Sequence, residues 1–305
     1  MTLTQLKYLV TVARLGSFAR AARDCHVAQP TLSLQIQKLE QELGTQLLDR
    51  KKNPVVPTSF GDEVIQQAHT VLLEADRLLE LVRENADSLQ GTLSIGVIPT
   101  IAYYLVPALF TRLREHYPAM DFRIHEIPTS QILNQLGRGE LDLGVLATPL
   151  KQSDIIEIPL YYEPFVAYMP PAWSGRRRNL TAADFQDQEL ILLGEEHCFR
   201  HQALKLCNSQ SAGQLECGSI ETIRRLVDSG VGMTLMPLLA VDAQSPQVAG
   251  FKAPRPVREV SLVYQRGFYK TRARQAIQSQ IQDLIPRSLQ KRQAMKVIGI
   301  ESSAL

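Results

Sequence analysis

The most reactive residue types of this chain occur together in one stretch, from Gly194 to Cys207. His197 precedes Cys198, and Arg200 follows two positions later. A cation close to a thiol favours the thiolate, which is the form that reacts with oxidants. We therefore expect the pKa of Cys198 to fall from about 8.5 into the physiological range, which would make this thiol an oxidant target.

Cys207 follows Cys198 by nine positions, and Ala203 to Cys207 has helical composition. Nine residues of helix would separate the two Cα atoms by roughly 13 Å, whereas a disulfide requires about 4.4–6.8 Å. A bridge between these two cysteines would require the segment to refold, and a bond that forms only after refolding can act as a two-state switch. The alternative is that both cysteines are inert small hydrophobes, as buried cysteines usually are.

Positive charge is concentrated at the N-terminus, where a polyanion could bind. Residues 1–60 contain eight Lys/Arg and four Asp/Glu, a net charge of +4, so the remaining 245 residues sum to −2. Apolar spacing predicts helices over Leu3–Val12 and Phe18–Asp24 and a third from Pro30, followed by a basic β-hairpin over 47–56. Together these elements predict a winged helix-turn-helix, which binds double-stranded DNA.

A long apolar repeat over Asp62–Leu89 predicts one continuous helix. At about 28 residues it would be roughly 42 Å long, too long to pack only on a small N-terminal domain, so we expect it to pair with a second copy of the chain. From Gln90 onward strands alternate with helices, which predicts an α/β architecture with largely parallel sheets. The expected strands are Thr92–Ile98, Asp121–Ile127, Leu141–Ala147, Glu189–Leu193, Gly232–Pro237 and Glu259–Tyr264, and the expected helices are Leu105–His116, Ser130–Gly137 and Glu221–Gly230.

The composition is that of a soluble globular protein, with 305 residues of which 45% are apolar and 21% charged. No apolar run approaches the roughly 18 residues of a membrane span, and the first residues do not form a signal peptide. We therefore expect a cytoplasmic protein without a membrane partner. The four cysteines are too few and too scattered for a disulfide scaffold. The sequence contains no metal-ligand cluster and no Gly-rich phosphate loop, so we expect no metal and no cofactor.

The N-terminal region resembles the DNA-binding domain of LysR-type transcriptional regulators, and the resemblance extends through the whole chain. It rests on Phe18–Ala22, Val27–Ser33 and Gln35–Glu40. It implies a winged helix-turn-helix over 1–60, a linker and dimerisation helix over 61–90, and a regulatory domain over 91–305 that is a two-lobed α/β structure like the periplasmic binding proteins.

The same resemblance implies which residues contact DNA. The residues that should approach bases are Gln29, Pro30, Thr31 and Ser33, and those that should hold phosphates or reach the minor groove are Arg50, Lys51 and Lys52. Two positions depart from the family. Ala28 replaces the usual serine, which removes a helix N-cap worth about 1 kcal/mol, and Leu34 stands where many relatives have arginine, so the operator sequence does not carry over.

Within that family, His197-Cys198-Phe199-Arg200 followed by Cys207 is similar to the members that sense hydrogen peroxide. Matches also occur at Ile98–Thr100, Thr129, Ser219–Arg224 and Tyr264–Arg266. The resemblance implies that peroxide oxidises Cys198 to a sulfenic acid and that Cys207 resolves it to a disulfide. It also implies a peroxide pocket, whose residues are Thr100, Thr129, His197, Arg200 and Arg266.

Several residues of the implied pocket have a structural alternative. Thr100 and Thr129 could cap helices that follow strands, Arg266 could be a solvated loop charge, and His197 could be a hydrogen-bonded core residue. His201 stands where the peroxide sensors usually carry aspartate, so it could relay protons or slow disulfide formation. Cys217 could compete as a resolving thiol, and Cys25 is most simply a small hydrophobe.

Taken together, the sequence predicts a homodimeric or homotetrameric transcription factor rather than an enzyme. It would bind promoter DNA of antioxidant genes, sense hydrogen peroxide through Cys198 and Cys207, recruit RNA polymerase and be reset by cellular thiol reductants. One alternative is a family member that binds a small organic anion between its lobes and whose cysteines are structural. The other is a thiol peroxidase that uses Cys198, although the sequence suggests no dedicated recycling machinery.

Overall fold

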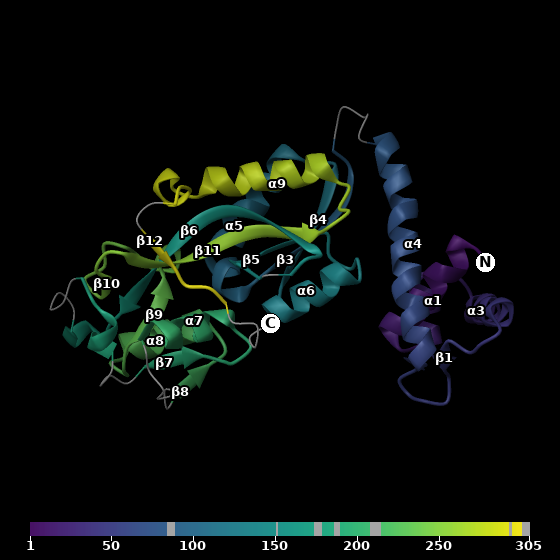
Figure 1. Ribbon diagram of the computed structural model, residues 1–305, viewed down its shortest axis with the longest axis horizontal. Helices are drawn as coiled ribbons and strands as arrows, with labels where there is room; N and C mark the ends of the chain where they lie inside the picture. Colours follow the sequence, from purple (N-terminus) through teal and green to yellow (C-terminus); the bar gives the residue numbers. More distant parts are fainter. Residues whose placement is uncertain are drawn as a thin grey trace. The chain divides into compact units, whose positions relative to one another are not determined.

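The computed structural model describes residues 1–83, 89–150, 152–173, 179–185, 190–207, 215–292 and 295–300. The chain divides into two compact units, Met1–Ala86 and Asp87–Leu305 (Figure 1). No helix in these described ranges has both the length and the apolar character needed to cross a lipid bilayer.

The N-terminal unit is the predicted winged helix-turn-helix. Its elements are α1 (Leu3–Leu15), α2 (Phe18–Asp24), α3 (Gln29–Leu43), β1 (Leu48–Asp49), β2 (Val56–Pro57) and α4 (Ser59–Arg83). The Ser17 hydroxyl caps α2 by accepting from the Arg20 N–H, whereas the N-cap residue of α3 is Ala28, which makes no side-chain cap. Strands β1 and β2 pair antiparallel and form the short wing.

Apolar residues spaced three or four apart on these helices form one core. Those with no exposed surface include Leu9 and Val12 of α1 and Leu32, Ile36 and Leu39 of α3. Helix α4 follows the wing and runs from Ser59 to Arg83, while residues 84–88 of the predicted long helix lie outside the described residues. Leu78 of α4 is 68% exposed, so the described residues of the N-terminal unit leave part of the apolar stripe uncovered.

The first lobe of the second unit is a sheet covered by helices on both sides. Figure 1 shows α9 on one side of this sheet and α6 on the other. The strands β3, β4 and β5 are parallel neighbours, and β11 lies antiparallel between β5 and β6. The elements are β3 (Gly91–Val97), α5 (Pro99–His116), β4 (Met120–Glu126), α6 (Thr129–Gly137), β5 (Leu143–Thr148), β6 (Ile155–Tyr168), β11 (Arg255–Gln265) and α9 (Thr271–Leu284).

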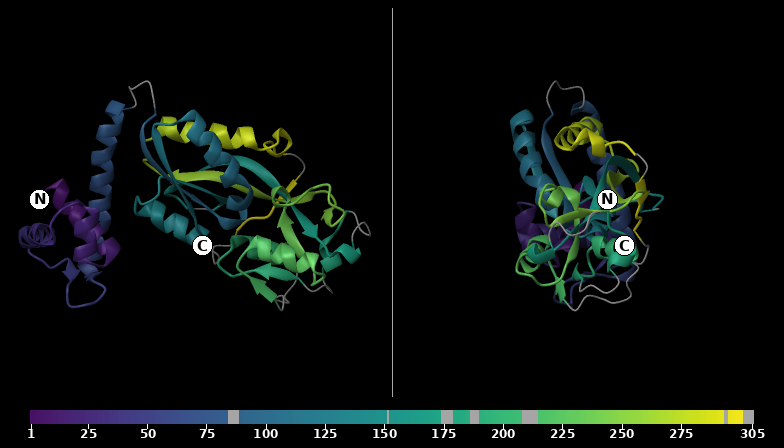
Figure 2. Two further views of the ribbon diagram at one scale, coloured as in Figure 1. Left: turned by 180° about the vertical axis from the view of Figure 1, so that it is seen from behind. Right: turned by 90° about the vertical axis from the view of Figure 1, so that its left-hand side faces the viewer.

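The second lobe is built on the far end of β6, and the left view of Figure 2 shows the two lobes of this unit. Strand β6 pairs with β11 as far as Pro164 and then with β9 and β10 over Phe165–Tyr168. The remaining elements are β7 (Ile191–Leu193), α7 (Cys198–Cys207), β8 (Leu215–Cys217), α8 (Ile220–Asp228), β9 (Thr234–Pro237), β10 (Val248–Gly250) and β12 (Met295–Val297), with short 3₁₀ turns η1 (Pro171–Trp173), η2 (Ala182–Phe185), η3 (Leu238–Ala240) and η4 (Arg287–Leu289). Each lobe has its own apolar core.

The predicted two-lobed α/β architecture is confirmed, but the expectation of largely parallel sheets is wrong. The main sheet is mixed, because β11 runs antiparallel to both β5 and β6. The longest strand, β6, was not predicted because Pro159 and Pro164 interrupt its apolar pattern. Pro159 lies at a shift in the register with β11, the kind of position at which a strand tolerates proline. Helix α9 was missed because its buried face shows few apolar residues.

Candidate redox site

Cys198 is the first residue of α7 and lies at the junction of the two lobes. Strand β7 ends at Leu193, and a turn closed by the hydrogen bond from His197 N–H to Gly194 O leads into the helix. Only 5% of Cys198 is exposed. Its side chain packs in the core of the first lobe, whereas the next residue, Phe199, packs in the core of the second. The thiol therefore lies where the two cores meet.

Cys207 is the last residue of the same helix and is completely buried in the second-lobe core. Both thiols are free. An unbroken helix from Cys198 to Cys207 places their Cα atoms roughly 13 Å apart, well beyond the reach of a disulfide. Burial raises the pKa of Cys207 to about 12, so this thiol is protonated at neutral pH.

The expected fall in the pKa of Cys198 is wrong for this conformation. Burial raises the pKa of the Cys198 thiol above its ordinary value, since removing a thiolate from water is costly. The positive charge of Arg258 and the hydroxyl of Thr129 act in the opposite direction. The cation that acts on this sulfur is therefore Arg258, which the sequence did not single out.

Arg258 lies in β11 and is 1% exposed, and each of its three guanidinium nitrogens donates to a protein acceptor. Its Nη1 donates to Thr100 Oγ1 over 2.7 Å and its Nη2 donates to the Thr100 carbonyl over 3.1 Å. Its Nε and Nη2 both donate to Glu163 Oε2, over 2.9 and 2.7 Å. The guanidinium also lies 5.3 Å from the centroid of the Phe199 ring, a cation–π contact to α7.

Glu163 of β6, with no exposed surface, compensates the buried charge of Arg258. The Tyr104 hydroxyl donates to Glu163 Oε2 over 2.9 Å, and the Leu239 N–H donates to Oε1 over 2.9 Å. The hydroxyls of Tyr104 and Tyr161 are 2.5 Å apart. Burial and the Glu163 carboxylate raise the pKa of both tyrosines far above the ordinary value, so both stay protonated. The network joins α5, β6, β11 and η3.

The two predicted pocket threonines lie in the first turn of a helix that follows a strand, and both are 2% exposed. Neither caps its helix, because the N-cap residues are Ile98 and Pro128 and no side-chain cap is made. The capping alternative for Thr100 and Thr129 is therefore wrong. Within the described residues Thr129 Oγ1 has no hydrogen-bond partner of normal geometry, although its proximity to the Cys198 sulfur lowers the pKa of that thiol.

The two other predicted arginines point elsewhere. Arg200 Nη1 donates to the Leu193 carbonyl over 3.0 Å, and its Nη2 pairs with Glu216 over 2.7 Å, so it ties α7 to β7 and β8. Arg266 is exposed and donates to the Ser153 carbonyl, which fits the solvated-loop alternative. Arg258 takes the place that Arg266 was expected to hold near Cys198.

The histidines and the third cysteine of the region lie close to α7. His197 is buried, and its Nε2 lies 3.4 Å from Glu196 Oε1. His201 Nδ1 is buried and has no hydrogen-bond partner in the described part of the chain. Cys217 lies opposite Leu193 in the parallel pair of β7 and β8, and burial raises the pKa of its thiol. His201 lies on α7 itself, His197 immediately precedes that helix, and Cys217 lies on β8.

A sequence signal for Arg258 and Glu163 does exist. Each is a charged residue next to apolar neighbours in a strand, in Val257-Arg258-Glu259-Val260 and in Leu160-Tyr161-Tyr162-Glu163. Buried charges are rarely tolerated without a partner, so two opposite charges in two buried strands indicate that the two side chains form an ion pair. That signal could be recognised only once β6 was known to be a strand.

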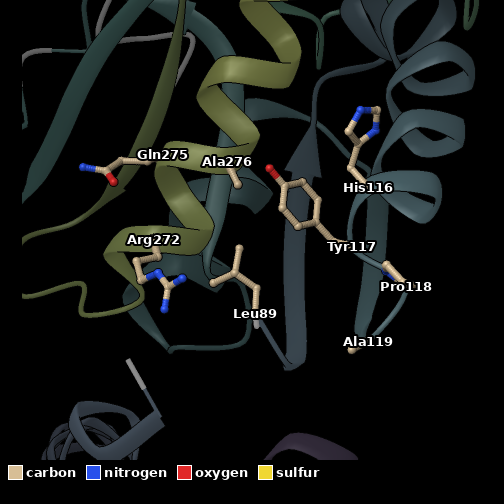
Figure 3. Close-up of a pocket in the computed structure, with 8 residues that line it drawn as sticks. All are labelled: Leu89, His116, Tyr117, Pro118, Ala119, Arg272, Gln275 and Ala276. Atoms are coloured by element: carbon tan, nitrogen blue, oxygen red, sulfur yellow. The ribbon is translucent and has the colours of Figure 1, made fainter. Parts of the chain in front are cut away.

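One cavity lies away from this site, between the end of α5 and the start of α9. Its volume is about 510 Å³ (Figure 3). It is lined by Leu89, His116, Tyr117, Pro118, Ala119, Arg272, Gln275 and Ala276. No predicted site residue lines it. Among the described residues no group of three or more His, Cys, Asp or Glu side chains is arranged to hold a metal ion.

Comparison with known proteins identifies the family. The model of the bacterial regulatory helix-turn-helix protein of the lysR family matches residues 3–62, and the LysR substrate binding domain matches residues 86–285. The chain belongs to the LysR family of transcriptional regulators. It is 38% identical over 276 residues to the DNA-binding transcriptional dual regulator OxyR of Escherichia coli K12, a match that covers 88% of this chain and 90% of that protein.

Solved structures of LysR-type regulators agree over most of the chain. Full-length OxyR from Pseudomonas aeruginosa, in a variant form, has a TM-score of 0.81 at 38% identity and covers 92% of this chain and 94% of that one. A hydrogen-peroxide-bound OxyR mutant from Corynebacterium glutamicum has a TM-score of 0.60 at 30% identity, with 92% and 93% covered.

The LysR-type helix-turn-helix presents its predicted DNA contacts at the surface of the N-terminal unit. Four residues, Gln29, Pro30, Thr31 and Ser33, lie at the start of α3, where only Ser33 is partly buried. Lys51 and Lys52 are exposed in the turn of the wing.

Arg50 in the same wing is partly engaged within the protein. Its Nη2 pairs with Glu40 over 2.7 Å, and its guanidinium lies 5.1 Å from the centroid of the Phe18 ring. The other oxygen of Glu40 accepts from the N–H groups of Leu47 and Leu48. Arg50 thus fastens the wing to α3 in addition to any contact it makes with phosphate.

Proposed function

We propose that this LysR-type regulator senses hydrogen peroxide through Cys198 and Cys207 and thereby changes its contacts with promoters of antioxidant genes. The observation that carries the proposal is the position of Cys198, buried where the lobes meet beside Arg258 and Thr129 and joined by one helix to Cys207. The names of the OxyR relatives support it.

The first step is a two-electron oxidation of Cys198. The thiol loses its proton, and the sulfur attacks one oxygen of the peroxide. The O–O bond breaks, and the departing hydroxide takes a proton and leaves as water, so that Cys198 becomes a sulfenic acid. In this proposal Arg258, which contacts Thr100, stabilises the thiolate, and the hydroxyls of Thr129 and Thr100 orient the peroxide. In this proposal His197 completes the pocket.

The second step forms the disulfide. The Cys207 sulfur attacks the Cys198 sulfenic acid, an S–S bond forms, and the hydroxyl of the sulfenic acid leaves as water with the proton of the Cys207 thiol. Because α7 holds the two thiols apart, the helix must open before this attack. Arg200 then loses the place it occupies between α7, β7 and β8, so the change spreads through the second lobe.

Oxidation then affects how the regulator acts at the promoter. We propose that two or four copies of the chain bind one extended DNA site through Gln29, Pro30, Thr31 and Ser33 and the basic wing, that the oxidised form recruits RNA polymerase, and that cellular thiol reductants restore the reduced form. The step at Cys198 is a single event per activation in a cytoplasmic regulator, and we expect no catalytic turnover of peroxide.

Thiol mapping by mass spectrometry tests this function directly. The full chain is treated with a brief, stoichiometric pulse of hydrogen peroxide, and the free thiols are alkylated. We expect a bridge between Cys198 and Cys207, and we expect it to persist in a Cys25→Ser control, whose altered thiol lies in the N-terminal unit. A Cys198 thiol that stays free at a large excess of peroxide would contradict the proposal and favour a regulator that responds to a small organic effector.

Replacement of Cys198 by serine tests the link to transcription. Cys198→Ser should abolish the response of a reporter promoter to peroxide and leave promoter affinity within about twofold, because the DNA contacts lie in the other unit. A variant that still responds fully contradicts the proposal. Rapid, repeated consumption of peroxide with a dithiol reductant would instead indicate a peroxidase.

A further inference from the structure

The last described residues of the chain, 295–300, cross both lobes and are called here the C-terminal strap. Strand β12 pairs parallel with the start of β11, with Val297 opposite Val257, and the Ile298 N–H donates to the Val257 carbonyl over 2.8 Å. Ile298 is 4% exposed in the core of the second lobe, and Ile300 packs against the core of the first. Figure 1 shows the strap running from β12 toward α7.

Gln202 connects this strap to the helix that carries both thiols. It lies between Cys198 and Cys207 on α7 and has no exposed surface. Its Nε2 donates to the Ile298 carbonyl over 2.7 Å. Its Oε1 has no partner among the described residues, so this hydrogen bond is the one that compensates the burial of the amide.

The strap thus holds α7 at its middle in the reduced form. Oxidation of Cys198 involves groups of α5, α6, β11 and the first residue of α7, none of which belongs to the strap. Formation of the disulfide is different, because α7 must open and Gln202 lies inside the segment that opens. The bond from Gln202 to Ile298 has to break in that second step or the strap has to move with the helix.

We propose that Gln202 is a positioning residue that fastens α7 to the C-terminal strap and sets the rate of disulfide formation without affecting the oxidation of Cys198. This inference rests on the proposed function and adds a regulator of its second step. The strap lies beyond residue 285, where the match to the family model ends.

The test separates the two steps in the full-length chain. The variant is Gln202→Leu, since leucine fills a similar volume but cannot donate to Ile298. The matched control is Gln280→Leu on α9, where another buried glutamine carries an unpartnered Oε1. Step one is timed in a Cys207→Ser background by trapping the sulfenic acid with a carbon nucleophile, and step two is timed by loss of both thiols on rapid alkylation.

We expect Gln202→Leu to accelerate disulfide formation about fivefold, the change in rate that one buried hydrogen bond corresponds to. Sulfenic acid formation should stay within about twofold, and Gln280→Leu should change neither rate. A chain that ends after Arg292, without the strap, should show the same selective acceleration with a larger factor.

The outcomes distinguish the two proposals. If the wild-type chain forms no sulfenic acid at Cys198, the proposed function fails and this inference fails with it. If sulfenic acid forms and Gln202→Leu leaves the second rate unchanged, slows it or changes both rates equally, the role of Gln202 alone is refuted.

A measurement on the wild-type chain does not depend on any variant folding. Amide hydrogen exchange should show that α7 loses protection around Gln202 when the disulfide forms. An α7 that remains fully protected in the oxidised chain would overturn the inference.

Discussion

The N-terminal unit and the redox site of the second unit are built in opposite ways. In the first, α1 to α3 and the wing are consecutive, and each predicted DNA-contact residue lies in a segment that its own neighbours in sequence define. In the second, Cys198, Thr100, Thr129 and Arg258 come from four elements, and Arg258 and Thr100 are 158 positions apart. The spacing of residues along the chain is therefore enough to predict the N-terminal unit, but it does not identify all the residues of the redox site.

Among the substitutions that separate the two regions, replacement of Arg258 should have the largest effect, both on stability and on the oxidation rate of Cys198. Arg258→Met leaves Glu163 buried without its partner, so we expect a loss of about 3–5 kcal/mol in the free energy of unfolding. We also expect oxidation of Cys198 to slow by about a hundredfold, since the positive charge of Arg258, which lowers the pKa of its thiol, is removed. Denaturant unfolding and sulfenic acid trapping measure the two effects.

Arg266→Met is the matched control for that experiment. Arg266 is exposed, so its replacement should change the free energy of unfolding by about 0.5 kcal/mol or less and leave the oxidation rate nearly unchanged. If Arg266→Met slowed oxidation and Arg258→Met did not, the assignment of the cation would be reversed.

The pH dependence of oxidation should show the next largest effect. Burial raises the pKa of Cys198, so the thiolate is a minor form at neutral pH, and the rate should rise about tenfold per pH unit from pH 6 to above pH 8. A rate that is constant over this range would mean a thiol already ionised at pH 7. Stopped-flow measurement of sulfenic acid formation in a Cys207→Ser chain gives the profile.

The burial of Cys207 affects the stability of the protein at high pH. Burial raises the folded-state pKa of Cys207 to about 12, so its contribution to stability is complete below the ordinary thiol pKa of about 9 and is lost as the pH rises toward 12. Urea unfolding between pH 8 and 11 should therefore show a decline that is smaller in Cys207→Ala. An equal decline in the wild-type and Cys207→Ala chains would mean that other titrating groups cause the loss of stability.

The N-terminal unit offers a smaller effect on DNA binding. Lys51 is exposed in the wing, so Lys51→Ala should weaken promoter binding similarly for all sequences and reduce the slope of log affinity against log salt by about 1. Oxidation of Cys198 should not change. Fluorescence anisotropy at several salt concentrations measures the slope, and an unchanged slope would remove Lys51 from the interface.

The smallest expected effect is a gain in stability at the start of α3. Helix α3 lacks a side-chain cap at Ala28, and Ala28→Ser restores a hydroxyl acceptor for the first free N–H groups. We expect about 1 kcal/mol of added stability in the N-terminal unit, with no change in peroxide oxidation. Thermal unfolding of the full chain followed by a probe in α3 would detect it, and an unchanged midpoint would show that the backbone cannot use the cap.

How much of the chain was predictable differs between these regions for a physical reason. The helices of the N-terminal unit were predicted because apolar residues at spacings of three and four define a buried face locally. Most strands of the second unit were predicted from short apolar runs that alternate with helical segments. Strand β6 was missed because its two prolines hide the pattern, and with it Glu163 could not be recognised as a buried charge.

The sequence by itself determined the family, the winged helix-turn-helix, the alternation of strands and helices, and the two cysteines at opposite ends of one helical segment. These depend on residue types and spacing along the chain. Only the tertiary structure decided that Arg258 rather than Arg200 or Arg266 acts on Cys198, and that Gln202 binds the C-terminal strap. Electrostatic and hydrogen-bond partners are set by distance in space, which spacing along a chain does not specify once strands from distant segments pair.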